Sequence, residues 1–257
     1  MRQLRWNDCL AALGLIGVGG GAPTELRPQS ELQSNCFNFP EDNFSPSNCV
    51  KCEYGTSPYF PLRVGDRAID FTLHDLTGQP WNLAEALSEG KPVVLIWGMF
   101  TCPAYQGLGT EPPFDKSSYW LESDTVELYK DRATFVHLYG AEPHPMIPDT
   151  NFDSGRLLPL YWSVIRQPLT YDGRLEMARR TLDLTHPNQV LLPDYLLGNP
   201  YSELVQPVWC TYAMGARTAT IVGEDGRIEY QRDWLQTERL QQAIDAYWSK
   251  KQGDKKT

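Results

Sequence analysis

The stretch that decides the fold is residues 91–103, which read Lys-Pro-Val-Val-Leu-Ile-Trp-Gly-Met-Phe-Thr-Cys-Pro. Its first half is a continuous apolar run, which is typical of a central strand covered on both faces of a sheet. Its second half ends at Cys102, immediately before Pro103. Functional residues of open α/β sheets gather just beyond the carboxyl ends of the strands. Cys102 is therefore the first candidate for chemistry.

The residues around Cys102 predict a reactive thiol. Proline favours the first position of a helix, so Cys102 is predicted to be the N-cap residue. A thiol there lies at the positive end of the helix dipole, which lowers its pKa. Tyr105 stands where a Cys-x-x-Cys motif has its second cysteine, so Cys102 needs a distant thiol, for which Cys210 is the weak candidate, or an external reductant. The competing interpretation is an inert, buried cysteine.

Apolar periodicity predicts the remaining elements. Strands are predicted around Ile69, Phe71 and Leu73, at 133–139 and at 189–192, with a hairpin of 218–222 and 227–231 that turns at Gly226. Helices are predicted at 82–87 with Asn82 as the cap, at 121–131, from Asp172 to 184 with Asp172 as the cap, and at 237–248. One or two helical turns broken by Pro207 are predicted in 201–212. The order β-α-β-α-β-α-β-β-β-α predicts an α/β protein with a central mixed sheet flanked by helices.

Composition bounds the class of protein. The 257 residues are 41% hydrophobic and 21% charged, with a net charge of −9, which is ordinary for a soluble globular chain and excludes a nucleic-acid binder. Clustered Pro and Gly predict an irregular extension over residues 1–61, followed by one domain over 62–250 and a polar tail over 251–257. A homodimer is left open.

The first 22 residues are the targeting candidate. Arg2 and Arg5 precede an apolar stretch that ends in Gly19-Gly20-Gly21, as in a signal peptide, although Asp8 and the glycines weaken the fit. Two interpretations remain open: a signal or loose anchor for an exported or membrane-associated protein, and a structureless start of a cytoplasmic one. The stretch is too short for a transmembrane helix.

The other cysteines of the extension do not form a recognisable metal site. Cys49 and Cys52 make half of a zinc motif, and the sequence offers no second half. A disulfide that involves Cys36, inert thiols and a metal remain the three alternatives. We expect no metal in the active site.

Two motifs carry a resemblance to a known family. Residues 64–73 and 90–95 resemble the opening of many redoxin-type proteins of thioredoxin fold. More specifically, Thr101-Cys102-Pro103-Ala104-Tyr105 resembles the motif of the iodothyronine deiodinases, with cysteine in place of selenocysteine, and residues 138–145 resemble the second motif of that family. The resemblance covers about residues 62 to 250 and implies a thioredoxin-like fold. The chain departs from the family at Phe100, in the stretch 166–169, at Ala216 and in an apparent insertion at 107–115.

The resemblance also implies roles for individual residues. Cys102 would be the nucleophile of a reductive dehalogenation of iodinated phenols, and Thr101 would orient its thiolate. A proton relay would involve Tyr139, Glu142 and His144, and Arg217 would bind a substrate carboxylate. The partners would be a small aromatic halogenated substrate and a thiol reductant as co-substrate, with no other cofactor. His137 is interpreted as packing.

Two other functions are compatible with the same residues. The first is a general redoxin-type thiol peroxidase or reductase. A peroxiredoxin has Thr or Ser three residues before its cysteine, whereas this chain has Met99. The second is a thioredoxin-fold binding module without catalytic activity.

Overall fold

The computed structural model describes residues 25–33, 62–102, 105, 123–142, 165–212, 218–232 and 235–254. Several predicted features lie outside the described residues: the targeting candidate at 1–22, the insertion at 107–115, Cys36, Cys49, Cys52, His144, Ala216 and Arg217.

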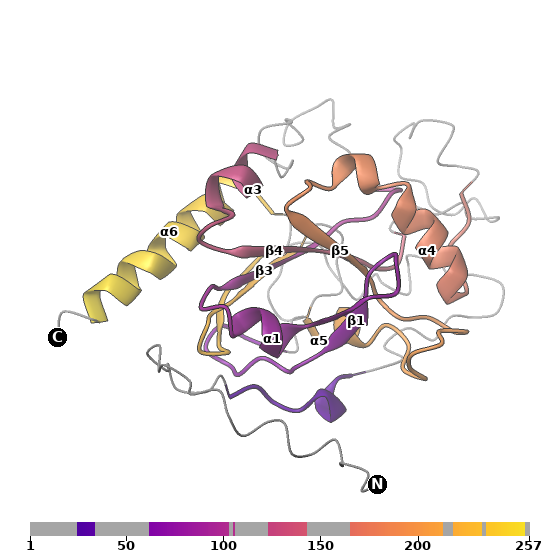
Figure 1. The fold of residues 1–257 in the computed structure, drawn as a ribbon, viewed down its shortest axis with the longest axis horizontal. Helices are drawn as coiled ribbons and strands as arrows, with labels where there is room; N and C mark the ends of the chain where they lie inside the picture. The colour runs from indigo at the N-terminus through magenta and orange to yellow at the C-terminus, as the bar shows by residue number, and fades with distance from the viewer. Residues whose placement is uncertain are drawn as a thin grey trace, which may run out of the picture.

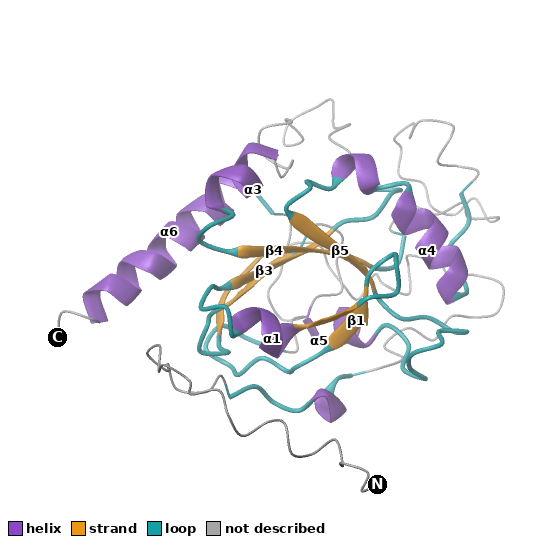
Figure 2. Cartoon of the chain, viewed as in Figure 1, coloured by secondary structure: helices purple, strands orange, loops and turns teal. Residues whose placement is uncertain are grey.

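A five-stranded mixed sheet forms the centre of the domain, in the order β5-β4-β3-β6-β7 (Figure 2). Its strands are β3 (Val93–Trp97), β4 (Thr134–Tyr139), β5 (Gln189–Pro193), β6 (Ala219–Val222) and β7 (Ile228–Arg232). β3, β4 and β5 run parallel, whereas β6 and β7 pair antiparallel as the predicted hairpin. Three parallel strands, with the following antiparallel hairpin paired on the other side of β3, give the central mixed sheet of a thioredoxin-like fold. The predicted fold class is confirmed.

Helices cover both faces of this sheet (Figure 1). On one face, α3 (Ser123–Tyr129) and α6 (Thr237–Asp254) pack with Val94 and Ile96 of β3. On the other face, Val93, Leu95 and Trp97 of β3 join a larger core with α1 (Leu83–Leu87), α4 (Tyr171–Arg179) and α5 (Pro207–Tyr212). Side chains alternate across a strand, so the apolar run in β3 supplies both cores. None of the described helices has the length and apolar character needed to span a bilayer.

The first predicted strand lies outside the central sheet. β1 (Thr72–His74) pairs antiparallel with β2 (Pro80–Asn82) in a separate two-stranded sheet. The intervening turn places Gly78 at φ 83°, a conformation that side chains disfavour. Ile69, Phe71 and Leu73 are nevertheless buried, as their alternation predicts. Alternation therefore identified the buried face of the segment and not its strand partner.

The predicted helix caps were right at α1 and wrong at α4. The Asn82 side chain accepts a hydrogen bond from the Glu85 N–H at 2.9 Å, as predicted. At α4 the cap is Thr170, whose backbone is extended and whose hydroxyl accepts from the Gly173 N–H at 3.3 Å. Asp172 lies in the first turn instead, where its charge favours the helix dipole. Pro207 begins α5 rather than breaking it, since proline suits a first helical position.

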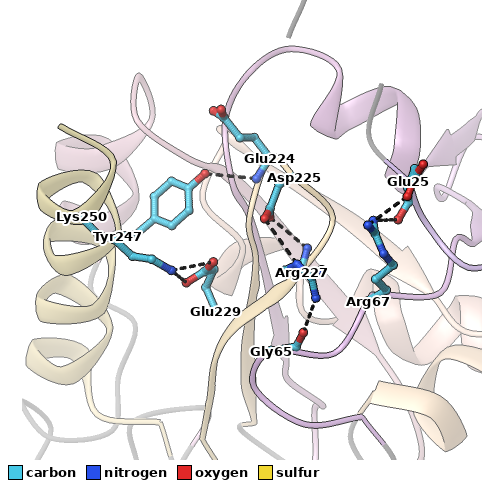
Figure 3. A network of polar contacts seen from close by, with 9 residues as sticks. All are labelled: Glu25, Gly65, Arg67, Glu224, Asp225, Arg227, Glu229, Tyr247 and Lys250. Carbon is cyan, nitrogen blue, oxygen red and sulfur yellow. Dashed lines mark hydrogen bonds and ion pairs between the residues drawn. The ribbon is translucent and has the colours of Figure 1, made fainter. Parts of the chain in front are cut away.

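Part of the N-terminal extension lies against the domain. The Arg27 N–H donates to the Ala68 carbonyl at 2.9 Å, and the Asp70 N–H donates to the Arg27 carbonyl at 2.8 Å. In Figure 3, Arg67 reaches Glu25, and Arg227 of the hairpin reaches the Gly65 carbonyl, at 2.8 Å. The two arginine side-chain contacts are exposed, so each contributes little free energy, and the backbone hydrogen bonds of Arg27 hold the segment against the domain. A short 3₁₀ helix follows at Gln29–Glu31.

Candidate active site around Cys102

Cys102 lies five residues beyond the end of β3 and is 1% exposed. Its backbone N–H donates to the Met99 carbonyl at 3.1 Å, which closes a tight turn. Its Sγ accepts a hydrogen bond from the Tyr105 N–H at 3.3 Å. An acceptor three residues before its donor is compatible with a helix N-cap, but the residues that would form this helix lie outside the described part of the chain, so the N-cap at Cys102 stays a prediction. This backbone donor favours a thiolate, whereas the burial of Cys102 in the apolar core disfavours a charged sulfur and is what the competing interpretation of an inert, buried cysteine predicts.

Thr101, next to Cys102, is anchored to Glu142. Oε2 of Glu142 accepts from the Thr101 N–H at 2.8 Å and from its hydroxyl at 2.7 Å. Oε1 of Glu142 accepts from the Tyr139 hydroxyl, which in turn accepts from the Phe100 N–H at 3.2 Å. The structure thus brings together three of the predicted relay and orienting residues. The role of Thr101 in orienting the thiolate stays a prediction, because its hydroxyl proton is donated to Glu142.

Burial dominates the electrostatics of this network. Glu142 and Tyr139 are both fully buried. Burial raises the pKa of Glu142, whereas its hydrogen bonds with Tyr139 and Thr101 and the charge of Arg174 act in the opposite direction. The pKa of Tyr139 is raised for the same reason and further by the charge of Glu142. A carboxyl group whose pKa is raised by burial is suited to hold and release a proton.

Gln167 is a site residue that the sequence did not reveal. Its Oε1 accepts from the Glu142 N–H at 2.9 Å, and its Nε2 donates to the Glu142 carbonyl at 3.4 Å. The side-chain amide thereby pairs with the backbone of Glu142 as a neighbouring strand would. Gln167 directly precedes Pro168 in a stretch without apolar periodicity, so no pattern pointed to it.

His137 has hydrogen bonds that the packing interpretation did not foresee. It is 1% exposed in β4, and its Nε2 donates to the Gly98 carbonyl at 2.8 Å. Its Nδ1 lies 3.1 Å from the Tyr105 hydroxyl and 2.8 Å from the Thr185 hydroxyl. A polar side chain inside an otherwise apolar strand was the available signal, because buried polar groups are hydrogen-bonded.

Arg174 supports the site from α4. It is fully buried and donates to the carbonyls of Asp194 and Tyr195 and to Oε1 of Gln206, at 3.0, 3.1 and 2.8 Å. Burial lowers its pKa to about 10, so it stays charged at neutral pH. Its charge favours the ionised form of Glu142. Among the described residues no group of three or more His, Cys, Asp or Glu side chains could hold a metal ion.

The remaining predicted residues are not gathered at this site in the described part of the chain. Cys210 is buried in α5 and is disulfide-bonded. Its role as resolving thiol stays a prediction, and it would need prior reduction of that disulfide. His144 and Arg217 lie outside the described residues. Among the described cysteines, Cys102 is the free thiol.

Comparison with known proteins gives structural matches alone. No family model and no curated protein matches the sequence. A putative protein disulfide isomerase from Bacteroides thetaiotaomicron matches with a TM-score of 0.45 at 18% identity, over 74% of this chain and 91% of that one. A putative thiol:disulfide interchange protein DsbE from Chlorobium tepidum matches at 0.43 and 14%, over 72% and 98%. Peroxidoxin BcpB from Mycobacterium tuberculosis matches at 0.38 and 17%, over 73% and 97%.

Proposed function

We propose that this protein is a thiol-dependent oxidoreductase in which Cys102 is the single nucleophile and an external thiol is the reductant. The observation that carries the proposal is the hydrogen bond from the Tyr105 N–H to Sγ of Cys102, at 3.3 Å. It holds a thiolate just beyond the end of a central strand, and the adjacent residue is anchored to a buried carboxyl group. The nucleophile and its stabilising donor thus lie three residues apart, and a buried carboxyl group from another segment contacts the residue before the nucleophile.

The reaction that requires the fewest groups of the site is the reduction of a disulfide. The Cys102 thiolate attacks one sulfur, the substrate S–S bond breaks, and a mixed disulfide with Cys102 forms while the other sulfur leaves as a thiolate. The leaving thiolate takes up a proton, for which Glu142, the buried carboxyl group bonded to Thr101, is the candidate donor. A first external thiol then attacks the mixed disulfide and regenerates the Cys102 thiolate, and a second completes the reduction of the substrate.

The test compares wild type with Cys102→Ser and Cys102→Ala on a small disulfide and on a peroxide, each with an excess of monothiol. We expect turnover in wild type and none above background in either variant. Because Cys102 is 1% exposed, alkylation under native conditions, mapped by mass spectrometry, reports how often a reagent reaches Sγ. Equal turnover in all three proteins would defeat the proposal.

A second candidate function is reductive dehalogenation of iodinated phenols. The favouring observation is the buried connection from Tyr139 through Glu142 to Thr101, because this reaction must deliver a proton to a ring carbon. The thiolate attacks iodine, the carbon–iodine bond breaks, and the carbon takes the proton while Cys102 becomes a sulfenyl iodide. An external thiol displaces iodide to form a mixed disulfide, and a second thiol restores Cys102. The resemblance to the deiodinase motifs supports this candidate.

Iodide release distinguishes the two functions. Iodinated tyrosines and thyronines are incubated with wild type and with Cys102→Ala in the presence of a dithiol. Cys102-dependent iodide release would support dehalogenation. Turnover on disulfides without iodide release would support thiol-dependent disulfide reduction instead. His144→Ala should reduce iodide release and leave Cys102 alkylation nearly unchanged if His144 belongs to the relay. An unchanged rate would remove it from that role.

A further inference from the structure

Two residues that flank Cys102 in the sequence, Gly98 and Tyr105, both bond to the side chain of His137. The carbonyl of Gly98, the first residue after β3, accepts from Nε2 at 2.8 Å. The hydroxyl of Tyr105 lies 3.1 Å from Nδ1. One imidazole in the neighbouring strand thus connects the chain before the nucleophile with the chain after it.

The donors and acceptors available on each group set the direction of these hydrogen bonds. A carbonyl only accepts, so Nε2 carries the proton, and Nδ1 of a neutral imidazole has one lone pair. The hydroxyls of Tyr105 and Thr185 both lie within reach of that lone pair. The Thr185 hydroxyl also reaches the Thr181 carbonyl, at 2.9 Å; when it donates there, the lone pair of Nδ1 accepts from the Tyr105 hydroxyl. The resulting chain runs from the phenol through the imidazole to the Gly98 carbonyl.

Burial keeps this chain intact over the working pH range. His137 is fully buried, and burial lowers its pKa to about 4. The imidazole is therefore neutral above about pH 5, and its donor and acceptor sides do not exchange. The ring of Tyr105 also packs directly on Gly98, since a Cβ at that position would lie 2.1 Å from Cε2 of the ring. Tyr105 is thus fixed at both its hydroxyl and its ring.

We propose that His137 and Tyr105 form a positioning pair that holds the Tyr105 N–H against Sγ of Cys102. The inference rests on the proposed role of Cys102 as the nucleophile. The phenol anchors residue 105, and the anchored backbone keeps its N–H at 3.3 Å from the sulfur. Without the anchor the N–H moves away for part of the time, and the thiolate loses stabilisation. The contacts described above for the two side chains are with each other, with Gly98 and with Thr185, so we assign them a positioning role.

The test measures the thiolate of Cys102 as a function of pH in the full chain. Two readouts are used: the alkylation rate of Cys102, and the ultraviolet absorbance of the thiolate as a difference from Cys102→Ser. The absorbance does not require a reagent to reach the sulfur. In Tyr105→Phe, which keeps the ring, we expect the midpoint to rise by up to about one pH unit. His137→Leu should behave alike, whereas His137→Gln should recover part of the effect because its amide can donate to Gly98 and accept from Tyr105.

A matched control exists elsewhere in the chain. The hydroxyl of Tyr195 lies 2.7 Å from Nδ1 of His74, on β1, and donates to the Thr72 carbonyl at 3.1 Å, so Tyr195→Phe removes a tyrosine–histidine bond and one further bond, neither of which involves Cys102. We expect its midpoint to equal that of wild type. A wild-type midpoint in Tyr105→Phe, or an equal rise in Tyr195→Phe, would overturn the proposal. Because the absorbance needs no substrate, absence of turnover in wild type would count against the proposed function and not against this pair.

Discussion

Thr101 and Glu142 are joined by two hydrogen bonds to one oxygen: Oε2 of Glu142 accepts from both the backbone N–H and the hydroxyl of Thr101, at 2.8 and 2.7 Å. These residues lie in two different segments, one after β3 and one after β4, and both are buried. The residue before the nucleophile is therefore fixed to a carboxyl group that receives donors on both of its oxygens.

Glu142→Gln should lower turnover strongly and stability moderately. The amide has one oxygen and one NH₂ group. At one of the two positions, the NH₂ group therefore meets a hydrogen-bond donor of Thr101 or Tyr139 instead of accepting from it. A buried donor left without an acceptor costs about 1–3 kcal/mol, which thermal or denaturant unfolding measures. The proton store is lost as well, because an amide does not titrate. Steady-state turnover on the substrate found for wild type checks this part.

Glu176→Gln is the control for this substitution, since Glu176 is exposed and contacts only the Arg180 side chain among the described interactions. It should change neither turnover nor stability by a measurable amount. Wild-type turnover in Glu142→Gln would show that the carboxyl group anchors Thr101 without taking part in proton transfer.

Tyr139→Phe should move the pH dependence of turnover in a defined direction. The Tyr139 hydroxyl donates to Glu142 and so lowers the pKa of the carboxyl group. Its removal raises that pKa further above the ordinary range. If the protonated form of Glu142 is the proton donor, the limb on which turnover falls with rising pH moves to higher pH. A pH–rate profile measures the shift, and movement to lower pH would contradict this direction.

Gln167→Ala should reduce turnover while leaving Cys102 in place. The amide holds the backbone of Glu142 through one bond in each direction, so its loss frees the carboxyl group to move. We expect a loss of stability of about 1–3 kcal/mol, because the backbone groups of Glu142 stay buried and lose their partners. Gln189→Ala is the control, because Oε1 of Gln189 also accepts a backbone N–H, that of His186, at 2.9 Å. An equal loss of turnover in both variants would refute a specific role for Gln167.

Tyr105→Cys should convert the site to a dithiol. The backbone of residue 105 already bonds to Sγ of Cys102, and the spacing becomes that of a Cys-x-x-Cys motif, in which the thiols lie close enough to form a disulfide. After air oxidation, peptide mapping should find a disulfide between positions 102 and 105, and turnover should need less external thiol. Free thiols at both positions after oxidation would contradict this expectation.

Much of the fold could be predicted from the sequence because its signals are local. The apolar run in β3, the Gly226 turn and the Asn82 cap each act within a few residues, and all three are found in the structure. The pairing of β1 with β2 could not be predicted in the same way. Both strands have three residues, and two-residue periodicity states which side chains are buried but not which strand lies alongside.

The sequence singled out some of the residues that meet near Cys102 and missed others, and the role of the site stays a prediction. Cys102 and Glu142 follow strand ends and Tyr139 ends β4, in two stretches that resemble motifs of one family. Gln167 contacts Glu142 across 25 positions, and His137 contacts Tyr105 across 32. No local pattern reports such pairings. Their common feature is a polar side chain that turns out to be buried, and burial is a property of the tertiary structure.

Asp194 offers a prediction on stability that is independent of the nucleophile. Its carboxylate accepts from the N–H groups of Tyr195 and Trp209 at 2.9 and 2.7 Å, and the second bond satisfies a donor at the start of α5. Burial raises its pKa from 3.8 to about 6, although Arg174 and these donors oppose the change. In the folded state the group therefore keeps a proton that the unfolded chain has already lost.

Asp194→Asn should flatten the pH dependence of stability between about pH 4 and pH 6. In that window the native state binds more protons than the unfolded state, so the free energy of unfolding falls as pH rises. A raised folded pKa gives stability that is present in full below the unfolded value and lost above the folded one. The loss attributable to Asp194 is about 3 kcal/mol. Urea unfolding across this window measures the slope, and an undiminished slope in the variant would show that another group carries it.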